Sequence, residues 1–368
     1  SLVVGGYFFA SAVYFFLSSR VDAAACAARG GRFRRLFALW ATGYRGTDGE
    51  RVRRRRVGFW LAAIILPLLI GASSVLGFVF GTQGARPGWF TALQGPGFVV
   101  MAGVSGVATL IIIVAGLRRF LRLEEVIPTF AVRWLANLLL SLTSIYLYFM
   151  IAEEVTASYA ASAPQTRVAH ETLFGAYAPL FWLVVASLGG CVVILFSQFA
   201  RRKTSIPWAV AAALLVNVGS ILRRYIIVVP SQTHGMLLPY EAGTYAPTWV
   251  EYCVVAGLLS AGVLIFMTFL KFFPVVPVQE EPDRVDGPVL PEPGGRRWAR
   301  RLLFAATLGA GLAMTAVGFF FSARYGTESF MDPALPFSPA VFIAGIVTCF
   351  LSAVVYELFP GPRPTPPA

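Results

Sequence analysis

The chain has 368 residues, of which 57% are hydrophobic and 13% are charged, and its formal net charge is +12. Soluble proteins carry about 25% charged residues, so this composition excludes a soluble enzyme, a nucleic-acid-binding protein and a disordered protein. Four long stretches contain no Asp, Glu, Lys or Arg: 57–80, 97–117, 174–197 and 302–321. Because about 20 apolar residues in a helix cross the hydrocarbon core of a bilayer, the sequence predicts an all-α, polytopic membrane protein.

Nine apolar spans follow one another along the chain. They are expected at about 1–19, 57–81, 97–117, 134–153, 174–198, 206–229, 247–270, 302–322 and 339–358. The chain starts inside an apolar run without a preceding Met, so we expect that a further N-terminal helix is missing. A stretch rich in Pro and Gly, 274–295, is predicted to be a linker between the seventh and eighth spans.

The basic residues are distributed asymmetrically between alternate connections. If the 20–56 connection is cytoplasmic, the segments on that side hold 25 of the 30 Lys and Arg residues. The positive-inside rule then predicts an external N-terminus and a cytoplasmic C-terminus in a bacterial inner membrane. The basic run 53–56 could form a patch for nucleic acid or lipid. We interpret it as marking the cytoplasmic membrane surface, where it contacts anionic lipid.

Residues that could bind a metal cofactor are scarce. The four cysteines stand apart without a Cys-x-x-Cys pair, so the sequence predicts neither an iron–sulfur cluster nor a zinc site. The only histidines, His170 and His234, fall in predicted loops. A membrane cytochrome b with two bis-histidine haems needs four histidines inside its helices. The sequence therefore predicts no haem and no metal in this chain.

Ionisable side chains within or beside membrane spans are costly and mark candidate functional sites. Most of them gather at the predicted outer face, and they are Glu153, Glu154, His170, Glu171, Arg223, Arg224, His234, Glu241 and Glu251, with Tyr146, Tyr148 and Tyr240 nearby. Two adjacent arginines cannot share one helix face. At least one of Arg223 and Arg224 is therefore expected to point into the bundle and to pair with Glu153 or Glu251.

Each of these candidates also has a purely structural interpretation. Glu153 and Glu154 could mark the water boundary, and the tyrosines could form an aromatic belt. Glu251 could stabilise a helix N-terminus through the helix dipole. Asn137 and Asn217, deeper in their spans, are expected to form hydrogen bonds between helices.

Four sequence segments share a recognisable pattern: Glu-Glu-Val-Thr-Ala-Ser-Tyr at 153–159, Arg-Arg-Tyr-Ile-Ile-Val-Val-Pro-Ser at 223–231, Tyr-Ala-Pro-Thr-Trp-Val-Glu at 245–251 and Lys-Phe-Phe-Pro-Val-Val-Pro at 271–277. These segments resemble the NrfD/PsrC family, the integral membrane subunits of polysulfide-reductase-like complexes. The resemblance covers about 1–278 and is most specific in 217–277.

The resemblance implies two four-helix bundles with flanking helices and no cofactor bound in the chain. On this pattern the chain divides into a first transmembrane bundle (1–153), an outer loop (154–173), a second bundle that includes an inside linker at 271–301 (174–322), and a flanking helix with an inside tail (323–368). It also implies electron exchange with a quinone, menaquinone or ubiquinone, near the outer face. The implied partners are an iron–sulfur subunit or a multihaem cytochrome, a molybdopterin-type catalytic subunit and other membrane subunits, as in alternative complex III and sulfur-metabolism complexes.

Quinone chemistry suits the residues at the predicted outer face, because Tyr, His and Glu can bond quinone oxygens and exchange protons. The predicted catalytic residues are Tyr146, Tyr148, Glu153, Arg223, Arg224 and Glu251, and the predicted quinone-binding residues are Tyr148, Glu153, His170, Arg224 and His234. The chain is thus expected to be a non-autonomous subunit of an oxidoreductase, with its redox partner docked over the 154–173 and 230–246 loops. Two alternatives stay open: a transporter or proton-conducting subunit without a redox role, with a helix broken at Gly189-Gly190, and a structural anchor.

Overall fold

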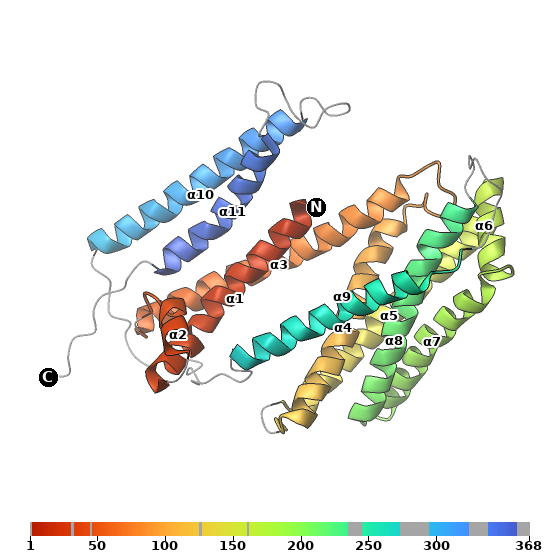
Figure 1. The fold of residues 1–368 in the computed structure, drawn as a ribbon, viewed down its shortest axis with the longest axis horizontal. Coiled ribbons are helices and arrows are strands. Elements are labelled where there is room, and N and C mark those ends of the chain that lie inside the picture. Colours follow the sequence, from red (N-terminus) through yellow and green to blue (C-terminus); the bar gives the residue numbers. More distant parts are fainter. Residues whose placement is uncertain are drawn as a thin grey trace. The chain divides into compact units, whose positions relative to one another are not determined.

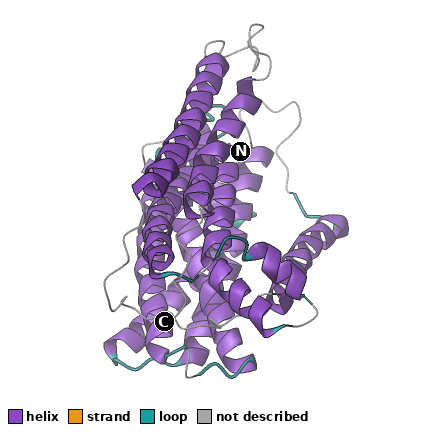
Figure 2. Ribbon diagram, turned by 90° about the vertical axis from the view of Figure 1, so that its left-hand side faces the viewer, coloured by secondary structure: helices purple, strands orange, loops and turns teal. Residues whose placement is uncertain are grey.

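The computed structural model describes residues 2–30, 33–44, 46–124, 127–159, 162–234, 245–272, 294–323 and 338–358. This part of the chain is helical, and Figure 2 shows no strand in it. The helices, labelled in Figure 1, are α1 (Leu2–Arg29), α2 (Arg34–Trp40), α3 (Asp48–Gly81), α4 (Gln94–Phe120), α5 (Thr129–Tyr159), α6 (Ala163–Leu173), α7 (Ala178–Ala200), α8 (Ile206–Thr233), α9 (Trp249–Phe272), α10 (Gly294–Ala323) and α11 (Ser338–Leu358).

Eight of the described helices are long and apolar enough to cross a membrane: α3, α4, α5, α7, α8, α9, α10 and α11. They coincide with eight of the nine predicted spans. The remaining prediction, at 1–19, overlaps α1, a helix of 28 residues. The predicted all-α membrane protein of about nine spans is confirmed.

Connections that were predicted to be loops contain helices. The 154–173 connection contains the end of α5 and the short helix α6, so the prediction that His170 lies in a loop was wrong. The 20–56 connection likewise contains the end of α1, all of α2 and the start of α3. α6 has only 11 residues, with a proline near its start, and it buries Val168, Ala169 and Thr172. Hydropathy failed to reveal this helix because only one narrow face of it is buried.

The described chain forms two compact units. Unit 1 comprises Ser1–Leu69 with Trp249–Ala368, and unit 2 comprises Ile70–Thr248. The boundary at Leu69 falls within α3, two residues after Pro67. Because proline lacks an N–H group, Pro67 removes one hydrogen bond from the interior of α3, close to the boundary between the two units.

Unit 2 contains a four-helix bundle made of α4, α5, α7 and α8. α4 packs against α5 and α8, α7 packs against the same two helices, and α6 contacts α5, α7 and α8. Small residues of α8 make the close packing possible, since Ala209, Ala212 and Ala213 are fully buried. The sequence-based division at residue 153 placed α4 and α5 in a first bundle and α7 and α8 in a second, whereas the contacts join all four helices.

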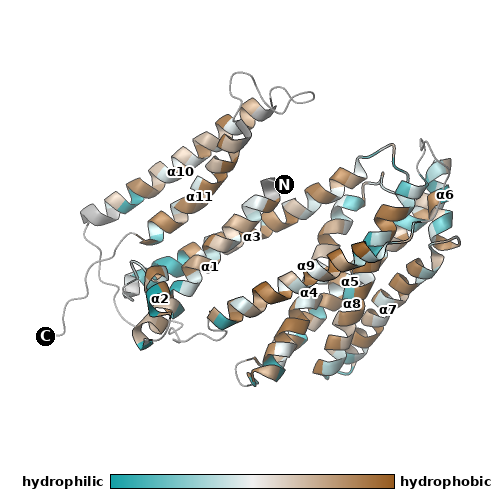
Figure 3. Cartoon of the chain, viewed as in Figure 1, coloured by the Kyte–Doolittle hydropathy of each residue, from teal (hydrophilic) through white to brown (hydrophobic). Residues whose placement is uncertain are grey.

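The outward faces of this bundle are apolar, as expected of a lipid-facing surface. Trp134, Val193 and Ile221 are among its exposed side chains, and Figure 3 shows hydrophilic residues around α6. α7 runs without interruption through Gly189-Gly190, so the helix break that a transporter would favour is not there. Asn217 bonds a neighbouring helix as predicted, accepting from the Thr109 hydroxyl at 3.4 Å.

Unit 1 contains the antiparallel pair α10 and α11, and α1 packs against α2 and α11. The Arg300 guanidinium lies 4.9 Å from the centre of the Tyr356 ring. Further along the pair, an added Cβ on Gly311 would come within 2.7 Å of the backbone nitrogen of Cys349. The two backbones therefore approach each other closely, as membrane helices do where glycine lines their interface.

Candidate functional site

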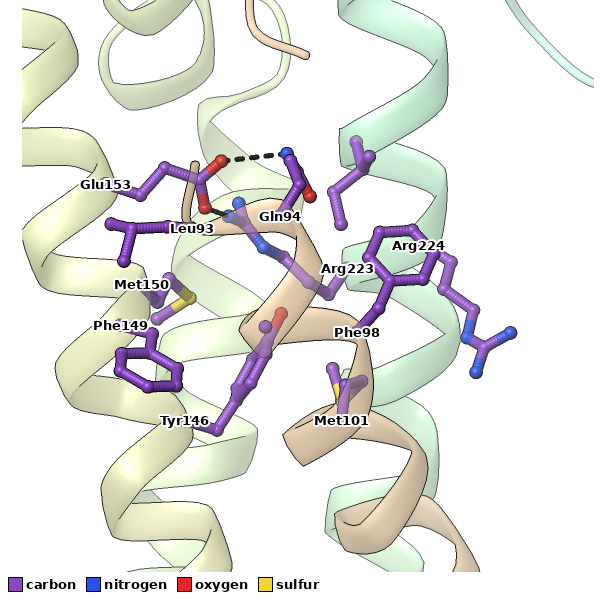
Figure 4. A pocket seen from close by; sticks show the side chains of 12 residues that line it. Leu93, Gln94, Phe98, Met101, Tyr146, Phe149, Met150, Glu153, Arg223 and Arg224 are labelled. Carbon is purple, nitrogen blue, oxygen red and sulfur yellow. Dashed lines mark hydrogen bonds and ion pairs between the residues drawn. The ribbon is translucent and has the colours of Figure 1, made fainter. Parts of the chain in front are cut away.

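A buried ion pair joins α5 and α8 at the end of the bundle where α6 lies. Arg223 of α8 is only 3% exposed. Its Nη2 lies 2.7 Å from Glu153 Oε2, and its Nη1 lies 3.4 Å from Glu154 Oε1. The predicted pairing of an inward-pointing arginine with Glu153 is therefore present, and Glu154 is a second partner. Figure 4 shows Arg223 reaching across toward Glu153.

The first residue of α4 completes this cluster. Gln94 Nε2 donates a hydrogen bond to Glu153 Oε1 at 3.0 Å, so both carboxylate oxygens of Glu153 are bonded. Gln94 is held in place by close backbone packing, because a Cβ added to Gly77 of α3 would come within 2.6 Å of the Gln94 carbonyl oxygen. A glycine at 77 is what allows this approach.

The segment before α4 is tied to the last turns of α8. The Trp89 indole N–H donates to the Ile227 carbonyl at 2.5 Å, and the Ser231 hydroxyl donates to the Pro87 carbonyl at 2.5 Å. These bonds place the start of α4 beside Arg223. The geometry of the cluster thus depends on three segments that are far apart in the sequence.

Two small cavities flank the ion pair. The first, of about 30 Å³, lies between α4, α5 and α8, and its lining includes Phe98, Met101, Tyr146, Phe149 and Arg224. The second, of about 50 Å³, lies toward α6, and its lining includes Glu154, Gln165, Thr172 and Ser231. Glu153, Arg223 and Ile227 line both cavities. Each has room for a water molecule or a few, so polar groups and water-sized spaces extend from the bundle interior toward α6.

Two pairs of predicted residues, Tyr146 with Tyr148 and Arg223 with Arg224, are divided by the structure. In each pair one side chain joins the cluster and the other lies outside it. Tyr146 is 5% exposed and lines the first cavity, whereas Tyr148 is 67% exposed and lies outside its lining. Arg224 borders this cavity but is exposed, and Figure 4 shows its guanidinium pointing away from Glu153. Arg223 and Tyr146 are therefore the members of each pair that join the cluster.

The remaining predicted residues lie outside the described cavity linings. His170 is exposed on α6, with its ring 5.6 Å from that of Phe174. His234 follows α8, and its Nδ1 lies 3.0 Å from the Thr233 hydroxyl. Glu251 is in the first turn of α9, in unit 1. Tyr240 and Glu241 fall outside the described residues.

The sequence did not lead us to predict Gln94 as a hydrogen-bond partner of Glu153. The available signal was a polar side chain at the start of an apolar run, at the same predicted membrane depth as Glu153. In the described part of the chain, no three His, Cys, Asp or Glu side chains come together as a metal site requires. What the cluster can do chemically is bond a polar ligand and exchange protons with it.

The apolar helices and the buried charges at one end of the bundle define an integral membrane protein with an intramembrane polar site. The family described as "Polysulphide reductase, NrfD" matches residues 3–234. The chain belongs to this NrfD family, which confirms the resemblance seen in the sequence.

Two curated relatives are similar to the chain. A putative membrane subunit of the dimethyl sulfoxide reductase of Halobacterium salinarum is 30% identical over 285 residues, which are 71% of this chain and 61% of the relative. A subunit of the selenate reductase of Mesobacillus selenatarsenatis is 26% identical over 235 residues, which are 62% of this chain and 54% of the relative. The chain thus spans somewhat more than half the length of each of these relatives.

Proposed function

We propose that this protein is the membrane subunit of a reductase-type oxidoreductase complex and that it exchanges electrons and protons with a membrane quinone. The observation that carries the proposal is the buried cluster of Glu153, Arg223 and Gln94 beside Tyr146. The two relatives named as reductase subunits support the same class of complex. We place the cluster at the external face of a bacterial inner membrane, with the C-terminus in the cytoplasm, from the distribution of basic residues.

The cluster offers each group that a quinone site needs. Arg223 pairs with the Glu153 carboxylate at 2.7 Å, and the Gln94 amide fixes the orientation of that carboxylate. Glu153 can accept a proton from a quinol hydroxyl or return one to a quinone oxygen. The Tyr146 hydroxyl supplies a hydrogen bond from the cavity floor. Glu154 and the second cavity then offer a route for protons toward α6.

The quinone ring needs more room than the resting structure offers. The first cavity measures about 30 Å³, whereas ligand pockets typically measure about 300–1,000 Å³. In the proposal, the ring enters from the side bordered by Phe98, Phe149 and Arg224. The two aromatic side chains turn aside, and the exposed Arg224 side chain borders the entry.

Replacing Glu153 by glutamine should lower quinol turnover by about 100-fold or more, because general acid–base groups typically contribute 10²–10⁴-fold. The amide keeps the shape of the side chain but cannot accept the proton. Turnover of a quinol analogue is measured in the purified, intact complex. Glu124→Gln is the control, since Glu124 is exposed between α4 and α5. Unchanged turnover in an assembled Glu153→Gln complex would contradict the proposal.

The redox partner is proposed to dock over α6. It is an iron–sulfur subunit or a multihaem cytochrome, with a molybdopterin-type catalytic subunit attached to it. α6 lies over the ion-pair cluster and presents exposed Arg167 and His170, so a partner there would have its nearest centre close to the quinone.

A photo-crosslinking residue at position 167 or 170 should capture the redox partner in the intact complex. The same residue at position 201, after the opposite end of α7, should not. Redox-partner cross-links obtained only from the 20–56 or 271–301 segments would place the partner on the other face and refute this docking.

A proton-conducting subunit without a redox role is the second candidate, and the cavities on both sides of the ion pair favour it. Bound quinone and inhibitor-sensitive quinol oxidation in the purified complex would support the first function. Proton flux without quinol oxidation would support the second. A complex that shows neither activity would leave only a structural anchor.

A further inference from the structure

We propose that unit 1 contains a binding site for one anionic phospholipid, in a groove between α3, α10 and α11. The groove has a volume of about 590 Å³, within the range of known ligand pockets. Its walls are mostly apolar and include Trp60, Leu61 and Ile64 of α3, Phe304 and Leu308 of α10 and Phe350 of α11. Two arginines, Arg56 and Arg301, also line it.

The two arginines lie at the same end of the groove. α11 runs antiparallel to α10, since Arg300 lies over Tyr356 and Gly311 lies against Cys349. α11 also runs antiparallel to α3, since Arg53 pairs with Glu357 while Leu61, two turns later, belongs to the cluster against which Phe350 packs. α3 and α10 are therefore parallel, and Arg56 and Arg301 both lie at the end marked by Glu357.

These two arginines differ from the basic residues buried next to them. Glu357 is 3% exposed and pairs with Arg53 at 3.4 Å and with Arg20 at 3.7 Å. Arg53 and Arg20 thus both have a carboxylate partner inside this buried group. Arg56 and Arg301, in contrast, are exposed and have no ion-pair partner among the residues that the structure describes.

Charge and shape together select the ligand. Two guanidinium groups at one end of a groove match a phosphate, which arginine binds through paired hydrogen bonds, and basic pockets between membrane helices bind anionic head groups. The apolar walls continue from that end toward Ile64 and Leu308, where acyl chains would lie. A free phosphate would gain nothing from these walls, and an uncharged lipid would gain nothing from the arginines.

Native mass spectrometry of the intact, detergent-solubilised protein can test the site during titration with phosphatidylglycerol. Replacing both Arg56 and Arg301 by glutamine should weaken phosphatidylglycerol binding by about 30-fold, because each basic residue at an anionic lipid surface strengthens binding about 5-fold. The control is the double variant Arg119→Gln with Arg201→Gln, which changes two exposed arginines of unit 2. Equal binding by the test and control variants would overturn the proposal.

Two further arms separate the lipid from other ligands. Replacing Ala353, another residue of the groove lining, by tryptophan should reduce phosphatidylglycerol binding while leaving both arginines in place. This variant also keeps the test valid if the double arginine variant fails to fold.

Equal binding of phosphatidylcholine and phosphatidylglycerol would show that charge plays no part. Displacement of the lipid by inorganic phosphate at equal concentration would show a simple anion site. Either result would refute an anionic phospholipid site.

Discussion

Replacing Arg223 by alanine should destabilise unit 2 by about 3–5 kcal/mol, the typical cost of removing one partner of a buried ion pair. The arginine side chain is buried, and it is paired with two carboxylates. Without it, Glu153 and Glu154 would stand side by side in a largely apolar environment with no compensating charge. Thermal unfolding of the detergent-solubilised protein, followed by intrinsic fluorescence, would measure the loss.

The neighbouring arginine provides the matched control. Arg224 has the same chemistry and lies on the same helix turn, but it is exposed. Arg224→Ala should therefore cost much less stability, because it leaves no buried carboxylate without its partner. Equal destabilisation by the two substitutions would show that the buried pair does not hold α5 and α8 together.

Replacing Gly311 by leucine should disrupt the α10–α11 pair, with a cost of at least about 1–3 kcal/mol, the usual range for overpacking. A Cβ at this position would come within 2.7 Å of both the backbone nitrogen and the Sγ atom of Cys349. Backbone atoms cannot turn aside as a flexible side chain can, so the two helices would have to separate. Protease sensitivity of the 294–358 region in detergent, together with the unfolding temperature, would report the change.

A second glycine on the same helix gives the control for this substitution. Gly309 has no atom within 4 Å of an added Cβ, and leucine has a higher helix propensity than glycine. Gly309→Leu should therefore leave the pair intact. If both variants behaved alike, close packing at Gly311 would not be what joins the helices.

Helical periodicity explains which predicted site residues come together. Tyr146, Met150 and Glu153 are spaced by four and three residues, so they share one face of α5 and line one cavity. Tyr148 is two residues from Tyr146 and points in another direction. On α8, Gly219, Ser220, Arg223 and Ile226 form the buried stripe, which leaves Arg224 outside it. This reasoning needs only the sequence once the buried face of each helix is known.

The sequence by itself determined the membrane class, the positions of the spans and the need for an inward arginine with a carboxylate partner. These features follow from local hydropathy and from the cost of burying a charge, both of which act along one helix. Only the tertiary structure decided that α4 and α5 pack with α7 and α8, that Gln94 bonds Glu153 and that α6 lies over the site. The bonds from Gln94 to Glu153 and from Thr109 to Asn217 join residues 59 and 108 positions apart. Such contacts depend on which helix faces are small enough to pack closely, a property that no single span reveals.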